Sequence, residues 1–464
     1  MNKQRWIPFA VASTLALAPL GQASTLEEIY QQALENDHTF KAAQASYEAG
    51  KENKKQGRAG LLPKINAEGN WADSTREENG TSDNLNSTPP VLGQTVATEA
   101  NNTRTGYKVA LVQPLFDMAA WHTFKQAGAA TDIAEAEFHI AEQNLILRSA
   151  QAYFDVLQAV DNLETARAEE NAFSHQLEQT RQRFEVGLTA ITEVHEAQAV
   201  YDSATAERLI AEGRLAISFE ALEVITGRPQ DELSPLKQGL PVAAPVPAER
   251  KAWVDMAMQH NYTLQVASLS SDVAKSFSKA QKAGHYPTLS GSISYSDYSD
   301  DGDNTGANYD LAQQDQAIGL TLTLPIYNGG GVSASRRKAA QEYIAARERY
   351  NQTQRDIVQT TRSVHLTVVT SVTTVKARAQ AITSNRSALE ATQAGYDVGT
   401  RDLVDVLNAQ RNLYRAQRDY YDALYAYVLS TLRLKEVAGT LSAPDVSELN
   451  NWLDISRKVE REEI

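Results

Sequence analysis

Cysteine is absent from the sequence of 464 residues. Its absence excludes disulfide bonds, thiolate metal sites, thiol catalysis and a lipid-modified N-terminal cysteine. Positive charge is also scarce, because 44 Lys and Arg residues face 58 Asp and Glu residues, for a formal net charge of −14. We therefore expect no nucleic-acid binding that depends on overall positive charge.

Long apolar runs are absent beyond residue 23, so no later segment reaches the roughly 18 apolar residues that indicate a membrane-spanning helix. Residues 1–23 are typical of a signal peptide, because Lys3 and Arg5 precede an apolar core and Gly21-Gln22-Ala23 offers small residues for cleavage. A buried N-terminal helix of a cytosolic protein is the alternative. We expect an exported protein that is either soluble or a β-barrel.

Motifs for catalysis and metal binding are missing as well. The sequence contains no P-loop, no Gly-x-Ser-x-Gly and no His-Glu-x-x-His, and its eight histidines are scattered. The segment from Asp301 to Gly306 resembles the start of a calcium loop, but Ala312 stands where that loop requires an acid. We therefore expect no enzyme, no cofactor and no metal site, with an envelope enzyme as a remote alternative.

One sequence pattern occurs twice in the chain, once on each side of a proline-rich linker. Pro63-Lys64-Ile65 corresponds to Pro287-Thr288-Leu289 at an offset of 224, and Phe184-Glu185-Val186-Gly187 corresponds to Tyr396-Asp397-Val398-Gly399 at 212. A period this long indicates a duplicated domain rather than a solenoid. The predicted divisions are a signal peptide at 1–23, a first repeat at 24–227, a linker at 228–250, a second repeat at 251–439 and a C-terminal segment at 440–464.

Each repeat contains two segments that alternate with the period of a β-strand. In the first copy Ile65, Ala67 and Trp71 share a face opposite Asn66 and Glu68. An apolar face backed by a polar one is typical of a membrane barrel strand, and a soluble sheet with one wet face is equally compatible. The predicted strands are about 64–73, 104–114, 288–298 and 316–325, joined by surface loops at about 73–103 and 297–315.

Very long helices are predicted after the strands, at residues 117–226 and 332–438, each range broken by one turn. Some 65 residues run without proline before each turn, which at 1.5 Å per residue reaches roughly 100 Å. The returning helix of the second copy has heptad order, which indicates coiled-coil packing. Its apolar row consists of Val406, Leu413, Tyr420, Tyr427 and Leu434.

Four strands cannot close a membrane barrel, because even the smallest barrels need about eight and open sheet edges are not tolerated in hydrocarbon. If these are membrane strands, several chains must contribute to one barrel. The long helices would then surround the same axis and form a tube. A two-helix stalk would account for the helices alone, but it leaves the strands unexplained.

The sequence closely resembles the TolC family of outer-membrane export channels, over essentially the whole mature chain. The resemblance implies an α+β membrane protein: a trimeric 12-stranded transmembrane β-barrel with four strands per chain, continued by a long periplasmic α-helical coiled-coil barrel. Its most specific motifs are the two turns Val186-Gly187-Leu188-Thr189-Ala190-Ile191-Thr192-Glu193-Val194 and Val398-Gly399-Thr400-Arg401-Asp402-Leu403-Val404-Asp405-Val406-Leu407.

In function, the resemblance implies a passive exit duct for secreted proteins, small toxic compounds or both. A homotrimer in the outer membrane of a Gram-negative bacterium would extend into the periplasm without a lipid anchor. It would meet a periplasmic adaptor protein and, through it, an inner-membrane ABC, RND or MFS transporter. The rival interpretations are a non-transporting structural or adhesive coiled-coil protein of the envelope, and a diffusion porin, in which the long helices have no place.

The resemblance also implies a gate at the helix turns. Thr192 and Glu193 of the first repeat would be bonded to Tyr396 and Arg401 of the second, and these bonds would hold the periplasmic end closed. Glu193 stands where the family more often has Asp, which changes the reach of the bond. Ordinary polarity of a helix surface is the simple alternative.

Three further sets of residues are expected to have a function. The resemblance implies that Asp405 occupies the position of an acidic ring at the entrance of the family's channels and that Asn408 stands in the place of a second acid, so a weaker cation block is expected. The adaptor would meet the hairpin tips at Gly187, Leu188, Gly399 and Thr400, where tight-turn geometry alone also explains the glycines. Membrane-interface aromatics would be Trp71, Tyr107, Phe116, Tyr295 and Tyr327, with core packing as the alternative.

Overall fold

The computed structural model describes two compact units, and each draws on both halves of the chain. A sheet unit comprises Gln44–Phe138 and Tyr262–Arg355, and a helical unit comprises Met1–Ala43, His139–Asn261 and Asp356–Ile464. Each repeat therefore contributes to both units. The predicted signal peptide lies outside the described residues except for Ala23. The structure describes residues 23–84, 88–89, 91–237, 239–304 and 307–461.

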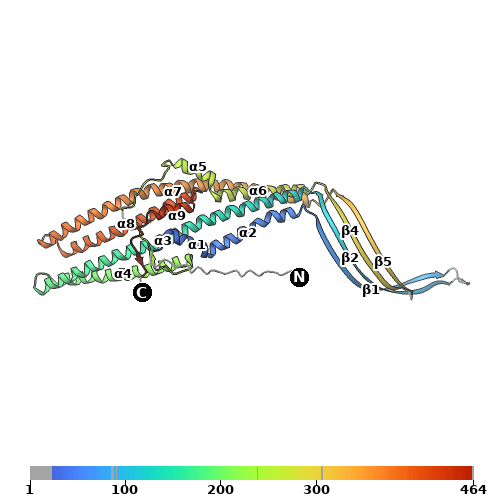
Figure 1. The fold of residues 1–464 in the computed structure, drawn as a ribbon, viewed down its shortest axis with the longest axis horizontal. Coiled ribbons are helices and arrows are strands. Elements are labelled where there is room, and N and C mark those ends of the chain that lie inside the picture. Colours follow the sequence, from blue (N-terminus) through green and yellow to red (C-terminus); the bar gives the residue numbers. More distant parts are fainter. Residues whose placement is uncertain (1–22, 85–87, 90, 238, 305–306, 462–464) are drawn as a thin grey trace, which may run out of the picture. The chain divides into compact units, whose positions relative to one another are not determined.

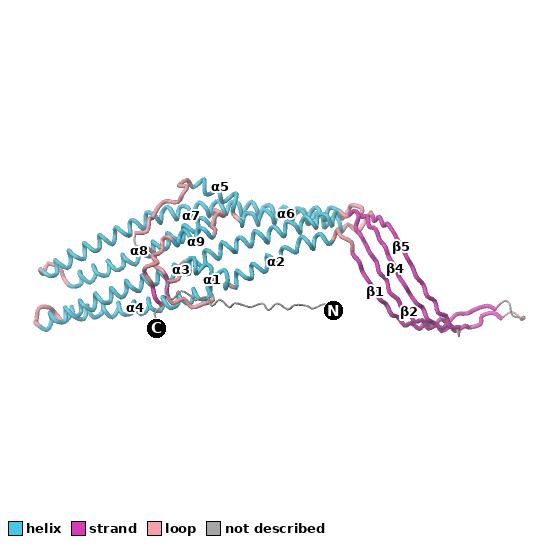
Figure 2. Tube along the Cα trace, viewed as in Figure 1, coloured by secondary structure: helices cyan, strands magenta, loops and turns pink. Residues whose placement is uncertain are grey.

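The sheet unit is built around four antiparallel strands in the order β1-β2-β4-β5 (Figure 2). Its helices are most of α2 (His38–Ala59), α6 (Tyr262–Ala283), and the first parts of α3 (Met118–Glu185) and α7 (Gly331–Asp397). Within the described residues, no helix is both long enough and apolar enough to cross a membrane. The strands are β1 (Lys64–Asn84), β2 (Val91–Phe116), β4 (Thr288–Asn304) and β5 (Ala307–Thr323).

Register aligns the apolar positions of all four strands on one face. Ile65 pairs with Leu111, Leu111 with Ile293, and Ile293 with Ile318. Because side chains alternate along a strand, residues in such a row share a face of the sheet. Ile318 is 85% exposed, so this row is not buried within the chain. The sheet therefore presents an uncovered apolar face.

The loops expected at 73–103 and 297–315 are a wrong prediction. The structure continues β1 to Asn84, resumes with β2 at Val91, and runs β4 and β5 through most of the second range. The residues there are polar, but cross-strand partners satisfy their backbones and many of their side chains. For example, the Arg104 guanidinium makes two bonds of 2.6 and 2.7 Å to the Asp300 carboxylate on the neighbouring strand.

The helical unit combines the remaining lengths of α3 and α7 with the helices that return from them (Figure 1). Its core includes the fully buried Tyr153, Phe154, Phe219, Leu222 and Leu434. A short pairing of β3 (Glu232–Leu233) with β6 (Val459–Glu460) ties the C-terminal segment to the linker. The other helices are α1 (Leu26–Asn36), α4 (Ile191–Thr226), α5 (Arg250–His260), α8 (Leu403–Val437) and α9 (Ala443–Asn450).

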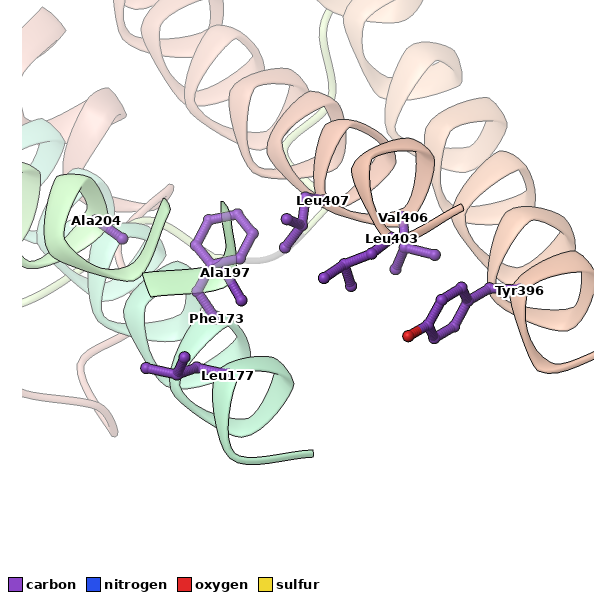
Figure 3. Packing of buried hydrophobic residues seen from close by; sticks show 8 residues of the cluster. All are labelled: Phe173, Leu177, Ala197, Ala204, Tyr396, Leu403, Val406 and Leu407. Carbon is purple, nitrogen blue, oxygen red and sulfur yellow. The ribbon is translucent and has the colours of Figure 1, made fainter. Parts of the chain in front are cut away.

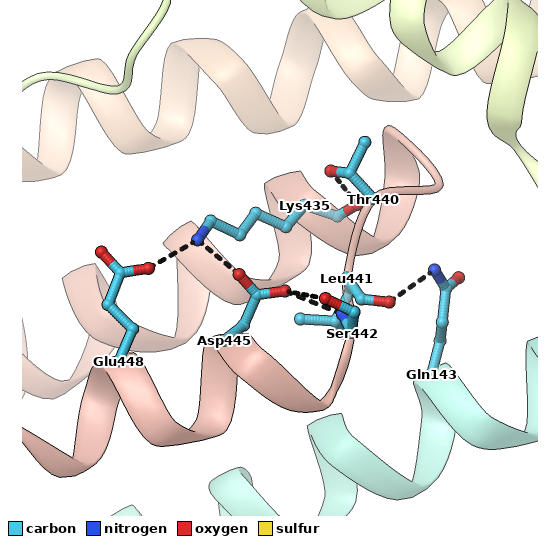
Figure 4. A network of polar contacts seen from close by, with 7 residues as sticks. All are labelled: Gln143, Lys435, Thr440, Leu441, Ser442, Asp445 and Glu448. Atoms are coloured by element: carbon cyan, nitrogen blue, oxygen red, sulfur yellow. Dashed lines mark hydrogen bonds and ion pairs between the residues drawn. The ribbon is translucent and has the colours of Figure 1, made fainter.

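A polar network fixes α9 beside α8 and α3 (Figure 4). The Lys435 ammonium lies 2.7 Å from Asp445 and 3.2 Å from Glu448. Asp445 also accepts a bond of 2.7 Å from the backbone N–H of Ser442, which completes a capping box at the start of α9. Gln143 of α3 donates to the carbonyl of Leu441 at 3.0 Å. The C-terminal segment is thus held by several bonds to both halves of the chain.

Candidate functional site

The two hairpin turns have the same backbone structure. Gly187 and Gly399 have φ values of +77° and +82°, a region that favours glycine. In the first turn the N–H of Leu188 donates to the carbonyl of Arg183 at 2.8 Å, and in the second the N–H of Thr400 donates to that of Gly395 at 2.9 Å. These bonds satisfy carbonyls at the helix ends. Their positions differ by 212 residues, the offset of the sequence repeat.

Exposed side chains cover the outside of both turns. Leu188 is 70% exposed and Val398 is 75% exposed, and Val186 is exposed to a similar degree. Thr400 is also exposed, with its hydroxyl donating to the Gly395 carbonyl at 3.0 Å. Together with the two glycines, these residues form the hairpin tips. Exposed apolar groups on turns are suited to contact with another protein.

The helices that follow the turns begin differently. Asp402 caps α8, because its side chain accepts from the N–H of Asp405 at 2.8 Å. The residue in the same place before α4 is Ala190, which has no side chain able to cap. Asp405 lies in the first turn of α8, where a negative charge is favoured by the helix dipole. The second turn is therefore the better anchored of the two.

Close to the turns, the two helix pairs pack on one another through a buried apolar cluster (Figure 3). Leu403 and Val406 are fully buried in it, next to the ring of Tyr396. The first pair contributes Phe173 and Leu177 from α3 and two alanines from α4. The cluster consists of Phe173, Leu177, Ala197, Ala204, Tyr396, Leu403, Val406 and Leu407.

Tyr396 connects this cluster to polar groups. Its hydroxyl donates to Oε2 of Glu193 at 3.4 Å, and the Arg183 guanidinium lies 4.8 Å from its ring centroid. Burial raises the pKa of the Tyr396 phenol, Arg183 opposes that shift and Glu193 adds to it. The phenol therefore stays protonated at neutral pH and can donate to Glu193. The structure thus brings together two of the four predicted latch residues, Tyr396 and Glu193.

The other two latch residues are placed differently. Arg401 lies 3.4 Å from the Asp405 carboxylate, four residues further along the chain, and both side chains are largely exposed. Thr192 is also exposed. Across the part of the chain that the structure describes, Arg401 makes no hydrogen bond or ion pair with Glu193 or Thr192. Within one chain Arg401 therefore acts on the predicted entrance residue and not on the predicted latch.

Asp405 and Asn408 lie near the start of α8, one turn apart and on the same side of the helix. Asn408 is exposed, and the Asp405 side chain is 42% exposed. Because Arg401 lies beside Asp405, it offsets part of the negative charge there. The predicted entrance site thus consists of an acid with its own counter-charge and a neutral amide.

The residues between the helix pairs that sequence analysis missed are polar. Arg418 of α8 pairs with Glu169 of α3 at 2.5 Å, and the Tyr425 hydroxyl donates to Asp161 at 2.5 Å. Arg418 and Tyr425 are seven residues apart, so the heptad spacing of α8 was the available signal. Arg183 was missed too, although it lies only four residues before Gly187. These contacts extend the connection between the pairs beyond the apolar cluster.

The predicted interface aromatics lie in the sheet unit. Trp71, Tyr107 and Phe116 are exposed, and Tyr327 is 82% exposed, which speaks against packing in the core of this chain. Tyr107 and Tyr295 form a ring pair with centroids 6.0 Å apart. For metals, no group of three or more His, Asp or Glu side chains among the described residues is arranged to hold an ion.

Comparison with known proteins gives one consistent result. The family model described as "Outer membrane efflux protein" matches residues 29–228 and 253–440. The outer membrane protein TolC of Vibrio cholerae is 36% identical over 460 residues, which cover 98% of this chain and 100% of that protein. The proteases secretion protein PrtF of Dickeya chrysanthemi is 29% identical and covers 96% of this chain and 95% of its own.

Solved structures share the fold at lower identity. The outer membrane protein VceC of Vibrio cholerae superposes with a TM-score of 0.70 at 20% sequence identity. The match covers 89% of this chain and 96% of that one.

Proposed function

The chain belongs to the outer membrane efflux protein family, and from that premise we propose how its two units carry out export. It is an outer-membrane channel that extends into the periplasm and serves tripartite export. The observation that carries this conclusion is the similarity to a full-length TolC, which spans both sequence repeats and both hairpin turns.

In our proposal the working assembly is a homotrimer. The four-stranded sheet has open edges at β1 and β5, and three copies would close them into one barrel, with the uncovered apolar face toward lipid. The helical unit also leaves a face without a partner: Ile210, Ile217 and Val224 of α4 recur every seventh residue and are exposed, with Ile217 at 70%. Such a row suits a helix from a neighbouring subunit.

The channel would be passive. The family is one of transport proteins, and the sequence has no nucleotide-binding motif that would supply energy. An inner-membrane ABC, RND or MFS transporter would drive export through a periplasmic adaptor, which would dock at the hairpin tips through Leu188, Val398 and Thr400. Because one relative is named for the secretion of proteases, secreted proteins are one class of cargo that we propose, with small toxic compounds as the other.

The gate would lie at the helix turns. We assign the latch to Tyr396 and Glu193, supported by their 3.4 Å bond and by the apolar cluster around it. Arg401 and Thr192 would take part only if a neighbouring subunit brings a partner within reach. Asp405 would form a ring of three carboxylates at the entrance that favours cations, weakened by Arg401 and by the neutral Asn408.

Recording from planar bilayers tests this function. Purified oligomer, added to one side, should give discrete conductance steps of one size, and a preparation from cells that lack the gene provides the control. A structural or adhesive coiled-coil protein would give no steps at any voltage, and that result would overturn the proposal.

A further inference from the structure

The four places where helix and strand meet lie at one end of the sheet. These are the junctions of α2 with β1, β2 with α3, α6 with β4, and β5 with α7. The register brings them together, because Lys64 pairs with Val112, Val112 pairs with Ser292, and Thr288 pairs with Thr323. Residues far apart in the sequence therefore gather around this end.

Positive charge is concentrated there. The junction segments 53–67, 114–131, 273–287 and 325–341 contain eleven Lys and Arg residues and a single acid, Asp117. We call these eleven residues the basic belt, and all of them are exposed. The whole chain carries a net charge of −14, so the belt is opposite in sign to the rest of the protein. Like charges gathered on one surface repel one another unless an anion lies against them.

Acidic neighbours neutralise little of the belt. Lys55 lies 2.6 Å from Glu52, and Lys338 lies 3.7 Å from Glu342. Among the residues that the structure describes, the other nine side chains of the belt form no ion pair. They include Lys54 and Arg58 near the end of α2, Lys279 and Lys282 near the end of α6, and Arg336 and Arg337 near the start of α7.

The belt borders the apolar face of the sheet. Exposed aromatic side chains lie at the same junctions, among them Trp121, Tyr286 and Tyr327. On the far side of the apolar rows the charge is reversed, since residues 73–104 and 297–315 contain eleven acids against two arginines. Along the strands, starting from the junctions with the helices, the order is thus cations, aromatics, apolar rows and then acids. Lys and Arg at such a border extend their charged ends toward headgroups while their methylene chains lie on apolar surface.

We propose that the basic belt binds the anionic headgroups of glycerophospholipids in the periplasmic leaflet of the outer membrane. The inference rests on the proposed function, which places the apolar face in that membrane with the helices in the periplasm. Each cation near an anionic surface contributes about 1 kcal/mol, or about fivefold in binding. The belt would select phosphatidylglycerol and cardiolipin over zwitterionic lipid and set the depth of the sheet in the bilayer.

The test compares lipid selectivity in reconstituted full-length protein. Spin-labelled phosphatidylglycerol and phosphatidylcholine are added in turn, and the motionally restricted fraction of each gives their relative association. A belt variant carries Lys54→Gln, Arg58→Gln, Lys279→Gln, Lys282→Gln, Arg336→Gln and Arg337→Gln. A matched control removes six exposed cations of the helical unit: Arg250→Gln, Lys251→Gln, Arg362→Gln, Lys376→Gln, Arg386→Gln and Arg415→Gln.

We expect the wild type and the control to prefer phosphatidylglycerol by about threefold or more, and the belt variant to lose most of that preference. Equal association of both lipids with the wild type, or an undiminished preference in the belt variant, overturns the proposal. So does a belt variant that keeps its lipid preference but no longer binds the adaptor, because the belt would then serve a protein partner.

Two further measurements separate the possible failures. Conductance of the belt variant in neutral bilayers reports the channel function independently of lipid selectivity. If the variant does not insert, the wild type is compared at low and high salt instead. Screening at high ionic strength should reduce the preference for phosphatidylglycerol, and a preference that is insensitive to salt overturns the proposal.

Discussion

The hydroxyl of Tyr396 on α7 donates a hydrogen bond to the Glu193 carboxylate on α4 across 3.4 Å. This bond joins the helix pair of the second repeat to that of the first, beside a buried apolar cluster. The length of the bond is near the upper limit for an O–H donor, so its strength lies below that of a short charge-assisted bond. The proposed latch would therefore resist opening only weakly, as suits a gate that a partner protein opens.

Loss of the latch should enlarge the conductance of the closed channel. Tyr396→Phe keeps the ring in the apolar cluster and removes only the bond to Glu193, so a modest rise in single-channel current is expected. Adding Arg401→Ala tests the proposed contact of Arg401 with a neighbouring subunit, and the double variant should give a larger rise. Tyr420→Phe, further along α8, is the control and should leave the current unchanged. An unaltered current in the double variant would exclude Tyr396 and Arg401 from the gate.

Asp405 and Arg401 should have opposite effects on block by multivalent cations. Asp405→Ala removes the proposed ring of carboxylates and should weaken block by a trivalent cation such as hexaamminecobalt. Arg401→Ala removes the charge that lies 3.4 Å from Asp405 and should strengthen it. Asn408→Asp, which adds a second acid one turn along, should also strengthen it. Titration curves in planar bilayers measure all three, and block that is the same in every variant rules out this entrance site.

Alanine at either turn glycine should destabilise the protein. At Gly187 and Gly399 nothing lies within 4 Å of an added Cβ, so the cost would come from the positive φ alone, about 1 kcal/mol or more. Gly213 is the matched control, because it lies inside α4 with equal free space and without a positive φ. Gly213→Ala should be neutral or stabilising. Chemical unfolding followed by circular dichroism distinguishes strain from a general intolerance of substitution.

Stability should depend on pH through Asp161. Burial raises the pKa of this carboxyl to about 6, although the Tyr425 hydrogen bond lowers it. Between about pH 4 and pH 6 the folded state holds more protons than the unfolded state, so the free energy of unfolding falls as pH rises. Asp161→Asn keeps an acceptor for Tyr425 and removes the titration. Between pH 4 and pH 7, the free energy of unfolding of the variant should therefore rise by about 2–3 kcal/mol relative to that of the wild type.

Tyr425→Phe is a second variant for that experiment, and it should raise the pKa of Asp161 instead of removing the titration. It removes the bond that lowers the pKa of Asp161, so the pH range in which the wild type loses stability should extend upward. Unfolding measured by circular dichroism at several pH values follows both variants. A difference between Asp161→Asn and the wild type that does not change with pH would contradict this account.

The fold was predictable where local chemistry repeats. The equivalent turns at Gly187 and Gly399 follow from the 212-residue offset, because both need a backbone conformation that favours glycine. The beginnings of β1 and β4 follow from Pro63 and Pro287, which cannot continue a helix. Strand length was not predictable, since the polar residues after Asp73 suit a loop as well as a paired strand. Only cross-strand partners such as Arg104 and Asp300 distinguish the two.

The candidate site likewise has features that the sequence predicts and features that only tertiary contacts decide. The sequence by itself determined the duplicated hairpins, the heptad rows and the concentration of cations at the strand junctions, since these depend on spacing and composition. Tertiary structure decided that Arg401 lies on Asp405, that Glu169 meets Arg418, and which ends of the strands come together. The reason is geometric. Local chemistry sets how a helix or strand forms, but the rotation of one helix against another and the register of a sheet depend on contacts between distant residues.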